Sequence, residues 1–175
     1  MNSKTLTLPL NLTILSQVSI FAGLSILSFF IPFSLGHPQW LVGTIVNASL
    51  FLAAVFLPKK YFLPLVIFPS LGVLARGIIF GPFTLFLVYF LPFIWLANLI
   101  LIFIFKVFFL KVKYISSVFF ASIVKFLFLF AVANICFNFH LVPKLFLQTM
   151  GLLQLFTALA GGIISFAVFN IYRNR

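Results

Sequence analysis

Long apolar runs follow one another along the chain from about residue 13, and short polar or Gly- and Pro-containing segments separate them. An apolar run of about 20 residues is long enough for an α-helix to cross the hydrocarbon core of a bilayer. Gly, Pro and Lys in the separators are typical of helix ends and connections. The pattern predicts six membrane-spanning α-helices, at about residues 13–34, 41–57, 61–80, 83–105, 114–139 and 145–171.

The third of these helices contains several residues that interrupt helices. They are Pro64, Pro69, Gly72 and Gly77. In membranes such interruptions often mark a helix that bends or breaks beside a cavity, where its freed backbone groups find other partners. We therefore expect the third helix to be bent or broken.

The composition indicates a membrane domain. Of the 175 residues, 65% are hydrophobic and 6% are charged, whereas soluble domains carry about 25% charged residues. The apolar runs extend along the whole chain, so we expect one all-α integral membrane domain over residues 1–175. The first apolar run has no small-residue cleavage site before it and is expected to be a retained helix.

The basic residues give an orientation, because cytoplasmic loops are enriched in Lys and Arg. Six helices place Arg76 and Lys144 on one side, Lys125 inside a helix and the remaining cations on the other side. Those remaining cations are Lys4, Lys59, Lys60, Lys106, Lys111, Lys113, Arg173 and Arg175. Both termini are therefore predicted to be cytoplasmic in a multi-pass protein of the cell membrane. The basic residues should favour anionic lipids, and no recognition motif points to nucleic acid.

Acidic residues are absent from the sequence, which has two His and one Cys. The composition excludes paired-carboxylate catalysis and carboxylate metal sites built from this chain. A single thiol also cannot build an iron–sulfur cluster. We therefore expect no catalytic residue, no metal site and no cofactor, and a protein that is not an enzyme.

Lys125 most needs an explanation, because it falls near the middle of the fifth predicted helix. A cation at the bilayer centre costs about 2.5–3.5 kcal/mol on insertion scales. Its helical face also carries Ala121, Ser122, Val132 and Cys136, a mostly small stripe that suggests an inward direction. Two interpretations stay open: Lys125 snorkels or is satisfied by carbonyls, or it binds a ligand or the acid of a partner.

Five further residues are candidates for a binding site. Asn47 and Asn98 place amides in apolar helices, where they either join helices or line a cavity. Arg76 could grip a carboxylate or phosphate, or could lie near lipid headgroups. Trp40 is either an interface anchor or a ligand platform, and Gln154 either reaches a cavity or bonds across helices.

Small residues spaced by four predict close helix contacts. In the last helix the pairs are Thr157/Gly161, Gly161/Ser165 and Ala158/Gly162. In the first helix, Ser19 and Gly23 form one such pair, a candidate contact with another membrane subunit or with a neighbouring helix.

Four segments carry a resemblance to known proteins. They are Gly43 to Phe51, Leu91 to Asn98, Lys125 to Phe130 and Gln154 to Gly162. With six helices and cytoplasmic termini, the chain resembles the substrate-binding (S) components of energy-coupling factor (ECF) transporters, and more specifically a related bacterial membrane family. Members of that family sometimes carry the label iron hydrogenase, an activity that one Cys without other cluster ligands does not support.

The resemblance implies a subunit that binds a vitamin, a vitamin precursor or a metal ion near the outer face. Such a subunit associates with a transmembrane coupling protein and cytoplasmic ATPases, and Ser19 and Gly23 loosely replace the alanine-rich coupling signature of the family. Metal is the poorer option here because the chain lacks carboxylates. We expect an outward cavity that favours an anionic or amide-rich small molecule, lined by Asn47, Arg76, Asn98, Lys125, Trp40 and Gln154.

The competing hypothesis is a structural or scaffolding membrane protein. In that case the Asn residues and the small stripes serve helix association, and Lys125 meets an acidic residue of a partner. A cavity at the candidate residues favours binding, whereas a dry and filled interior favours the scaffold.

Overall fold

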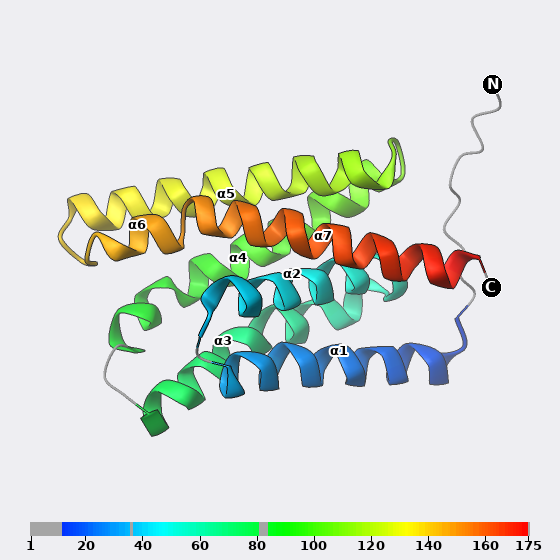
Figure 1. The fold of residues 1–175 in the computed structure, drawn as a ribbon, viewed down its shortest axis with the longest axis horizontal. Coiled ribbons are helices and arrows are strands. Elements are labelled where there is room, and N and C mark those ends of the chain that lie inside the picture. The colour runs from blue at the N-terminus through cyan, green and yellow to red at the C-terminus, as the bar shows by residue number, and fades with distance from the viewer. Residues whose placement is uncertain (1–11, 36, 81–83, 175) are drawn as a thin grey trace.

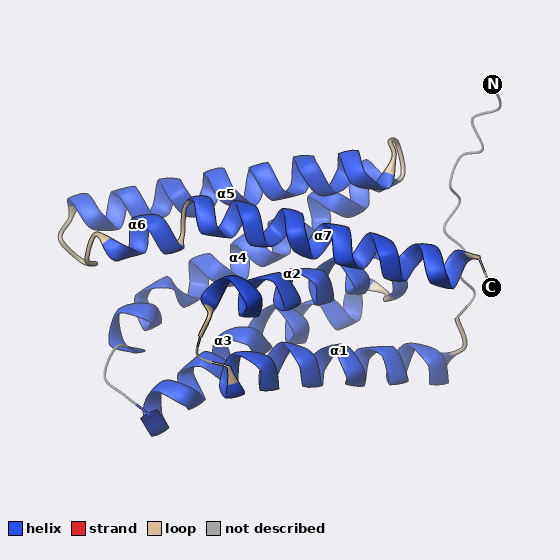
Figure 2. Ribbon diagram, in the orientation of Figure 1, coloured by secondary structure: helices blue, strands red, loops and turns tan. Residues whose placement is uncertain are grey.

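The computed structural model describes residues 12–35, 37–80 and 84–174. Within these ranges the chain is helical and contains no strand (Figure 2). The elements are α1 (Ile14–Ser34), α2 (Gln39–Phe56), the 3-10 helix η1 (Lys59–Tyr61), α3 (Phe62–Phe80), α4 (Thr84–Phe109), α5 (Tyr114–Asn138), α6 (Leu145–Thr149) and α7 (Leu152–Arg173). The expected all-α chain with six long helices is confirmed, and η1 and α6 are additions that the sequence pattern did not indicate.

The helix bounds agree well with the pattern at α1, α2 and α5. Thr13 caps the start of α1, since its side chain accepts a hydrogen bond from the backbone of Ser16. The expected end of the fourth helix at residue 105 was wrong, because α4 continues to Phe109 and includes Lys106. Lys106 fits inside the last turn because its ammonium reaches the carbonyl of Leu57, 3.4 Å away.

The expectation that the third helix breaks was wrong, whereas a bend in it stays a prediction. α3 runs as one helix from Phe62 to Phe80 with Pro69 inside it. Pro64 falls in the first turn, where the missing backbone N–H has no intrahelical partner to lose. Gly72 is buried against α1, and a Cβ there would collide with the carbonyl oxygen of Phe29. This glycine therefore allows close packing between two helices.

The last predicted helix is the one that breaks, between α6 and α7. Gly151 lies at the break, and a side chain there would collide with the carbonyl oxygen of Leu147 and approach the ring of Phe130. The backbone of Gly151 adopts φ −97° and ψ −121°, outside the helical region. The connection between α6 and α7 therefore depends on a residue without a Cβ.

Four helices form a ring in which each helix packs against the next (Figure 1). The order around the ring is α2, α4, α5 and α7, with α7 returning to α2. We call these four helices the central bundle. Gly161 brings α7 close to α2, because its Cβ would lie 2.7 Å from the backbone nitrogen of Ala48 and from the carbonyl oxygen of Thr44. The close packing expected for the last helix is confirmed at this position.

The two remaining long helices, α1 and α3, pack against each other beside the central bundle (Figure 1). Both also contact α2, and α3 contacts α4. α1 buries Leu24, Ser28 and Pro32 on its inner side and exposes most of the rest of its surface. The α1–α3 pair is therefore an outer layer on one flank of the bundle.

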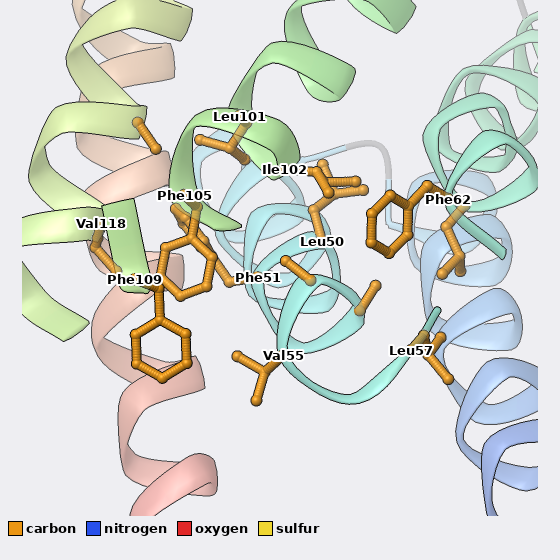
Figure 3. Packing of buried hydrophobic residues seen from close by; sticks show 14 of the residues in the cluster. Leu50, Phe51, Val55, Leu57, Phe62, Leu101, Ile102, Phe105, Phe109 and Val118 are labelled. Atoms are coloured by element: carbon orange, nitrogen blue, oxygen red, sulfur yellow. The ribbon is translucent and has the colours of Figure 1, made fainter. Parts of the chain in front are cut away.

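Aromatic side chains fill the end of the bundle where α4 meets α5. Phe105 packs edge-on against Phe51, with ring centres 5.0 Å apart, and also against Tyr114 at 5.0 Å. Figure 3 shows Phe51, Phe105 and Phe109 grouped between the helices. Edge-to-face ring pairs at such separations add attraction to the burial of their area. These three Phe residues are therefore part of the buried core.

Five helical segments of the described residues are long and apolar enough to cross a membrane. They are α1, α2, Val88–Phe109 within α4, α5, and Phe146–Arg173, which joins α6 to α7. α3 is not among these five, so the sixth span stays a prediction. The start of α1 and the end of α7 lie at the same end of the molecule (Figure 1), in keeping with an even number of long helices. We call this the inner end, following the charge pattern, and the opposite end the outer end.

Candidate functional site

Lys125 lies near the middle of α5 and is buried, with 2% of its surface exposed. Its Nζ donates hydrogen bonds to Oδ1 of Asn47 and to Oδ1 of Asn98, both at 2.7 Å. Asn47 comes from α2 and Asn98 from α4, and both are as buried as the lysine. The ammonium therefore joins three helices of the central bundle at their interior.

Asn47 extends the contact to the fourth helix. Its Nδ2 donates to Oγ1 of Thr157 on α7 at 3.2 Å and to the carbonyl of Gly43 at 2.8 Å. Thr157 in turn donates to the carbonyl of Gln154 at 3.2 Å. We call Asn47, Asn98, Lys125 and Thr157 the polar cluster. It takes one residue from each helix of the ring.

Gly43 helps to position this cluster, because it leaves room for the side chain of Thr157. A Cβ at residue 43 would lie 3.0 to 3.1 Å from the atoms of that side chain. The threonine methyl therefore packs on the bare backbone of α2 while its hydroxyl faces Asn47. The spacing of small residues predicted a packing role for Thr157, whereas its hydrogen bond to Asn47 was not predicted.

The two asparagines are not equivalent. Asn47 uses its amide oxygen and both amide hydrogens, since it accepts from Lys125 and donates to Gly43 and Thr157. Asn98 accepts from Lys125, and its Nδ2 has no hydrogen-bond partner among the described residues. An ammonium carries three N–H donors, of which Lys125 uses two here. Donors are therefore left over on the α4–α5 side of the cluster.

Two more buried polar atoms lie one helical turn from the cluster. Within the described part of the chain, Nε1 of Trp95 and Oγ of Ser122 have no partner. Trp95 precedes Asn98 by three residues on α4, and Ser122 precedes Lys125 by three on α5, so each pair lies on one helix face. Trp95 was not predicted as a site residue, although its spacing of three residues from Asn98 could have indicated it.

The polar cluster contains a positive charge and no negative side chain. The chain has no Asp and no Glu, so amide and hydroxyl oxygens are the acceptors that its side chains can offer to a buried ammonium. An isolated buried cation is costly unless it is paired or well hydrogen-bonded. The cluster supplies hydrogen bonds to Lys125 without supplying a counter-charge.

Arg76 lies apart from these contacts. Its Nη1 donates to the carbonyls of Phe33 and Ser34, at 3.0 and 2.8 Å. These carbonyls belong to the last turn of α1, where a cation also meets the negative end of the helix dipole. Arg76 therefore fastens α3 to the end of α1, and these two hydrogen bonds do not involve the polar cluster.

Trp40 and Gln154 lie toward the outer end. The side chain of Trp40 is 58% exposed in the first turn of α2. Gln154 is half-buried in the first turn of α7 and touches the cluster through its backbone carbonyl. The structure thus brings together Asn47, Asn98 and Lys125, connects Gln154 through the backbone, and leaves Trp40 on the surface.

Ser19 and Gly23 are exposed on α1. A Cβ added at Gly23 would meet no atom within 4 Å. A neighbouring helix of the described chain therefore does not cover this glycine. The pair therefore faces away from the other described helices.

The described residues do not form a metal centre, and one pocket that they line lies away from the polar cluster. No group of three or more His, Cys, Asp or Glu side chains lies close enough to hold a metal ion in the described ranges. A pocket of about 380 Å³ at the outer end is lined by Phe137, Asn138, His140, Val142 and Pro143. This pocket contains none of the residues that the sequence analysis assigned to a site.

Comparison with known proteins gives no relative: no family model, no curated protein and no solved structure matches the chain.

Proposed function

We propose that this chain is a membrane-embedded binding subunit for a small anionic or amide-rich molecule, of the kind that serves as the S component of an ECF transporter. A vitamin or a vitamin precursor is the substrate class that the resemblance implies. The proposal includes a transmembrane coupling protein and cytoplasmic ATPases as partners. The exposed Ser19 and Gly23 on α1 are then a candidate contact for the coupling protein.

The surplus of hydrogen-bond donors around Lys125 is the observation that carries the proposal. Nε1 of Trp95 and Oγ of Ser122 are buried without a partner in the described residues. The hydrogen bonds of Lys125 and Asn98 in the described residues leave the third N–H of the lysine and the Nδ2 of the asparagine unused. All four groups can donate, and Trp95 can only donate. Buried polar groups are rarely left unpaired, so a molecule rich in acceptors fits this environment.

Charge points to the same class of ligand. A bound carboxylate or phosphate would give the buried ammonium the counter-charge that the sequence cannot provide. Hydrogen bonds between ionised groups are shorter and stronger than those between neutral groups. A neutral ligand with several amide carbonyls satisfies the donors but leaves the charge unbalanced, so an anion is the better match.

Native mass spectrometry of the gently purified protein tests the proposal. Wild type should carry a small molecule that is absent from Lys125→Met and Asn98→Ala. Lys113→Met is the matched control, because Lys113 is the exposed N-cap residue of the helix that carries Lys125. The control should retain the molecule. An empty wild type, or equal retention in Lys125→Met, would contradict the binding function.

A scaffolding protein is the second candidate, and one observation favours it. The polar cluster joins all four helices of the central bundle, which is what helix-joining amides do in a membrane. In this case Lys125 stabilises the bundle or meets an acidic group of a partner. The scaffold would be favoured over the binding subunit if wild type carried no small molecule but co-purified with another membrane protein. Lys125→Met should then lose that partner.

A further inference from the structure

Three lysines lie at one corner of the inner end, where α2 passes through η1 into α3. Lys59 and Lys106 converge there, and the Nζ of Lys60 lies 5.0 Å from the ring centre of Tyr61. Lys59 and Lys60 belong to η1 and are exposed, and Lys106 lies on the last turn of α4. The Nζ of Lys59 lies 5.9 Å from the ring centre of Phe103 on α4. Lys59 therefore reaches from the η1 connection toward α4.

Lys106 reaches in the opposite direction, from α4 toward the start of α3. Its Nζ lies 5.0 Å from the ring centre of Phe62 on α3 and 3.4 Å from the carbonyl of Leu57, to which it donates. Phe62 and Phe103 also contact each other, with ring centres 6.1 Å apart. The two lysines are thus held at the same junction by a shared pair of aromatic rings.

This junction has positive charge and no acid to balance it. The sequence contains no Asp or Glu, so an anion close to these ammonium groups has to come from outside the chain. The contacts that the lysines do make, to aromatic faces and to one carbonyl, leave N–H donors free for such an anion.

Exposed apolar side chains continue from the lysines along the two helices. On α3 they are Leu63 and Leu71, and on α4 they are Leu96 and Phe103, each pair about two turns apart. α3 and α4 pack against each other, and the contact of Phe103 with Phe62 places Phe103 beside their seam. A cationic head with an apolar track below it is complementary to a molecule with an anionic head and acyl chains.

We propose that the junction of Lys59, Lys60 and Lys106 binds the phosphate headgroup of an anionic phospholipid, whose acyl chains lie along the exposed α3–α4 seam. The site is separate from the polar cluster and does not depend on the function proposed for it. Lys59 and Lys60 hold the phosphate from the exposed side, and Lys106 holds it from the half-buried side. Phe103 and Leu63 meet the first part of the acyl chains.

Lipid retention in nanodiscs that contain phosphatidylcholine and phosphatidylglycerol tests this proposal. The protein is released from the nanodiscs in a native mass spectrometer, and the number of phosphatidylglycerol molecules that stay bound is measured. Removing two lysines near a headgroup should lower the affinity about thirtyfold. We therefore expect Lys59→Gln/Lys60→Gln to lose the bound phosphatidylglycerol that wild type retains.

Lys111→Gln/Lys113→Gln is the matched control, because it removes two exposed lysines from the same end of the molecule. The control should retain the lipid. Equal loss in both double variants would mean that diffuse charge, and not a site, attracts the lipid. Equal retention in both would also overturn the proposal.

Two further measurements distinguish lipid binding from phosphate binding and from unfolding. Millimolar inorganic phosphate should not displace the lipid, and displacement would show a site for free phosphate instead. Both double variants should melt at the temperature of wild type, since the altered lysines are exposed. Lys106→Gln should reduce lipid retention less than the η1 double variant, because it removes one charge and leaves a side chain that can still donate.

Discussion

The α1–α3 pair and the central bundle are held together by different kinds of contact. In the pair, Gly72 allows a close approach to the backbone of Phe29, and Arg76 binds carbonyls at the end of α1. In the bundle, side chains from four helices bond to one another around Lys125. The pair is fastened at points along its length, and most of the surface of α1 is free. The bundle is organised around a buried charge.

This difference separates contacts that serve helix packing from contacts that packing does not explain. A helix pair can be closed by glycine and by a cation at a helix end without burying any charge that needs a partner. The polar cluster is a costly way to join helices, because it brings a cation to the middle of the bundle. The central bundle therefore contains a buried cation that helix packing does not require. The α1–α3 pair has no such buried cation at the contacts that join its described residues.

The largest expected effect is that of Asn47→Ala on the bundle. The substitution removes the acceptor for Lys125 and the donor to Thr157 and Gly43 together. Leaving a buried charged group short of a partner should lower the free energy of unfolding by about 3 kcal/mol or more. Denaturant titration in mild detergent measures the change. Asn134→Ala, whose amide bonds to the carbonyl of Phe130 within its own helix, should cost much less.

The next largest effect concerns the contact between α2 and α7. In Gly161→Ala the new methyl would lie 2.7 Å from backbone atoms of Thr44 and Ala48. The helices have to move apart, at an expected cost of about 1–3 kcal/mol in unfolding free energy. Gly23→Ala is the control, because no atom lies within 4 Å of the added carbon. Equal melting temperatures for the two variants would refute the close contact.

The α1–α3 pair should respond separately from the bundle. Gly72→Ala places a methyl against the carbonyl of Phe29 and should separate α1 from α3. Hydrogen exchange measures this directly: the amides of α1 should exchange faster, while those of α5 and α7 stay protected. Faster exchange throughout the molecule would mean that the pair and the bundle open as one unit.

The smallest expected change in stability is that of Lys125→Met. The substitution removes the buried charge and leaves two asparagine oxygens without their donor. A buried charge can often be replaced by an apolar residue of similar size without loss of stability, so we expect a cost of about 1 kcal/mol. The folded variant should still lack the bound molecule. A loss of stability as large as that of Asn47→Ala would mean that Lys125 mainly joins helices.

Much of the fold could be predicted from the sequence, because the apolar runs and their separators set the long helices. The break at Gly151 was not predicted, because apolar residues on both sides of Gln148 and Thr149 continue the pattern of one long helix. The continuity of α3 through Pro69 was also not predicted, because a proline in the sequence does not show whether the helix continues. Prolines and glycines indicate where a helix can bend, whereas packing against a neighbour decides whether it does.

The site could be predicted in part. Asn47, Asn98 and Lys125 stood out because each is polar in an apolar helix, but their meeting depends on which helices are neighbours in the ring. Arg76 stood out for the same reason, and its attachment to α1 follows from the pairing of α1 with α3, which no single helix reveals. Thr157 resembled a small packing residue, because its hydroxyl gains a role only beside Asn47.

A density map of the wild-type protein purified in lipid nanodiscs, at a resolution that shows side-chain hydrogen bonds, tests the central claim most directly. Our account predicts density for a small acceptor-rich molecule within hydrogen-bond distance of Nζ of Lys125 and Nδ2 of Asn98. If side chains alone surround the ammonium, with its third N–H bonded to Ser122 or to a backbone carbonyl, the binding function would be contradicted.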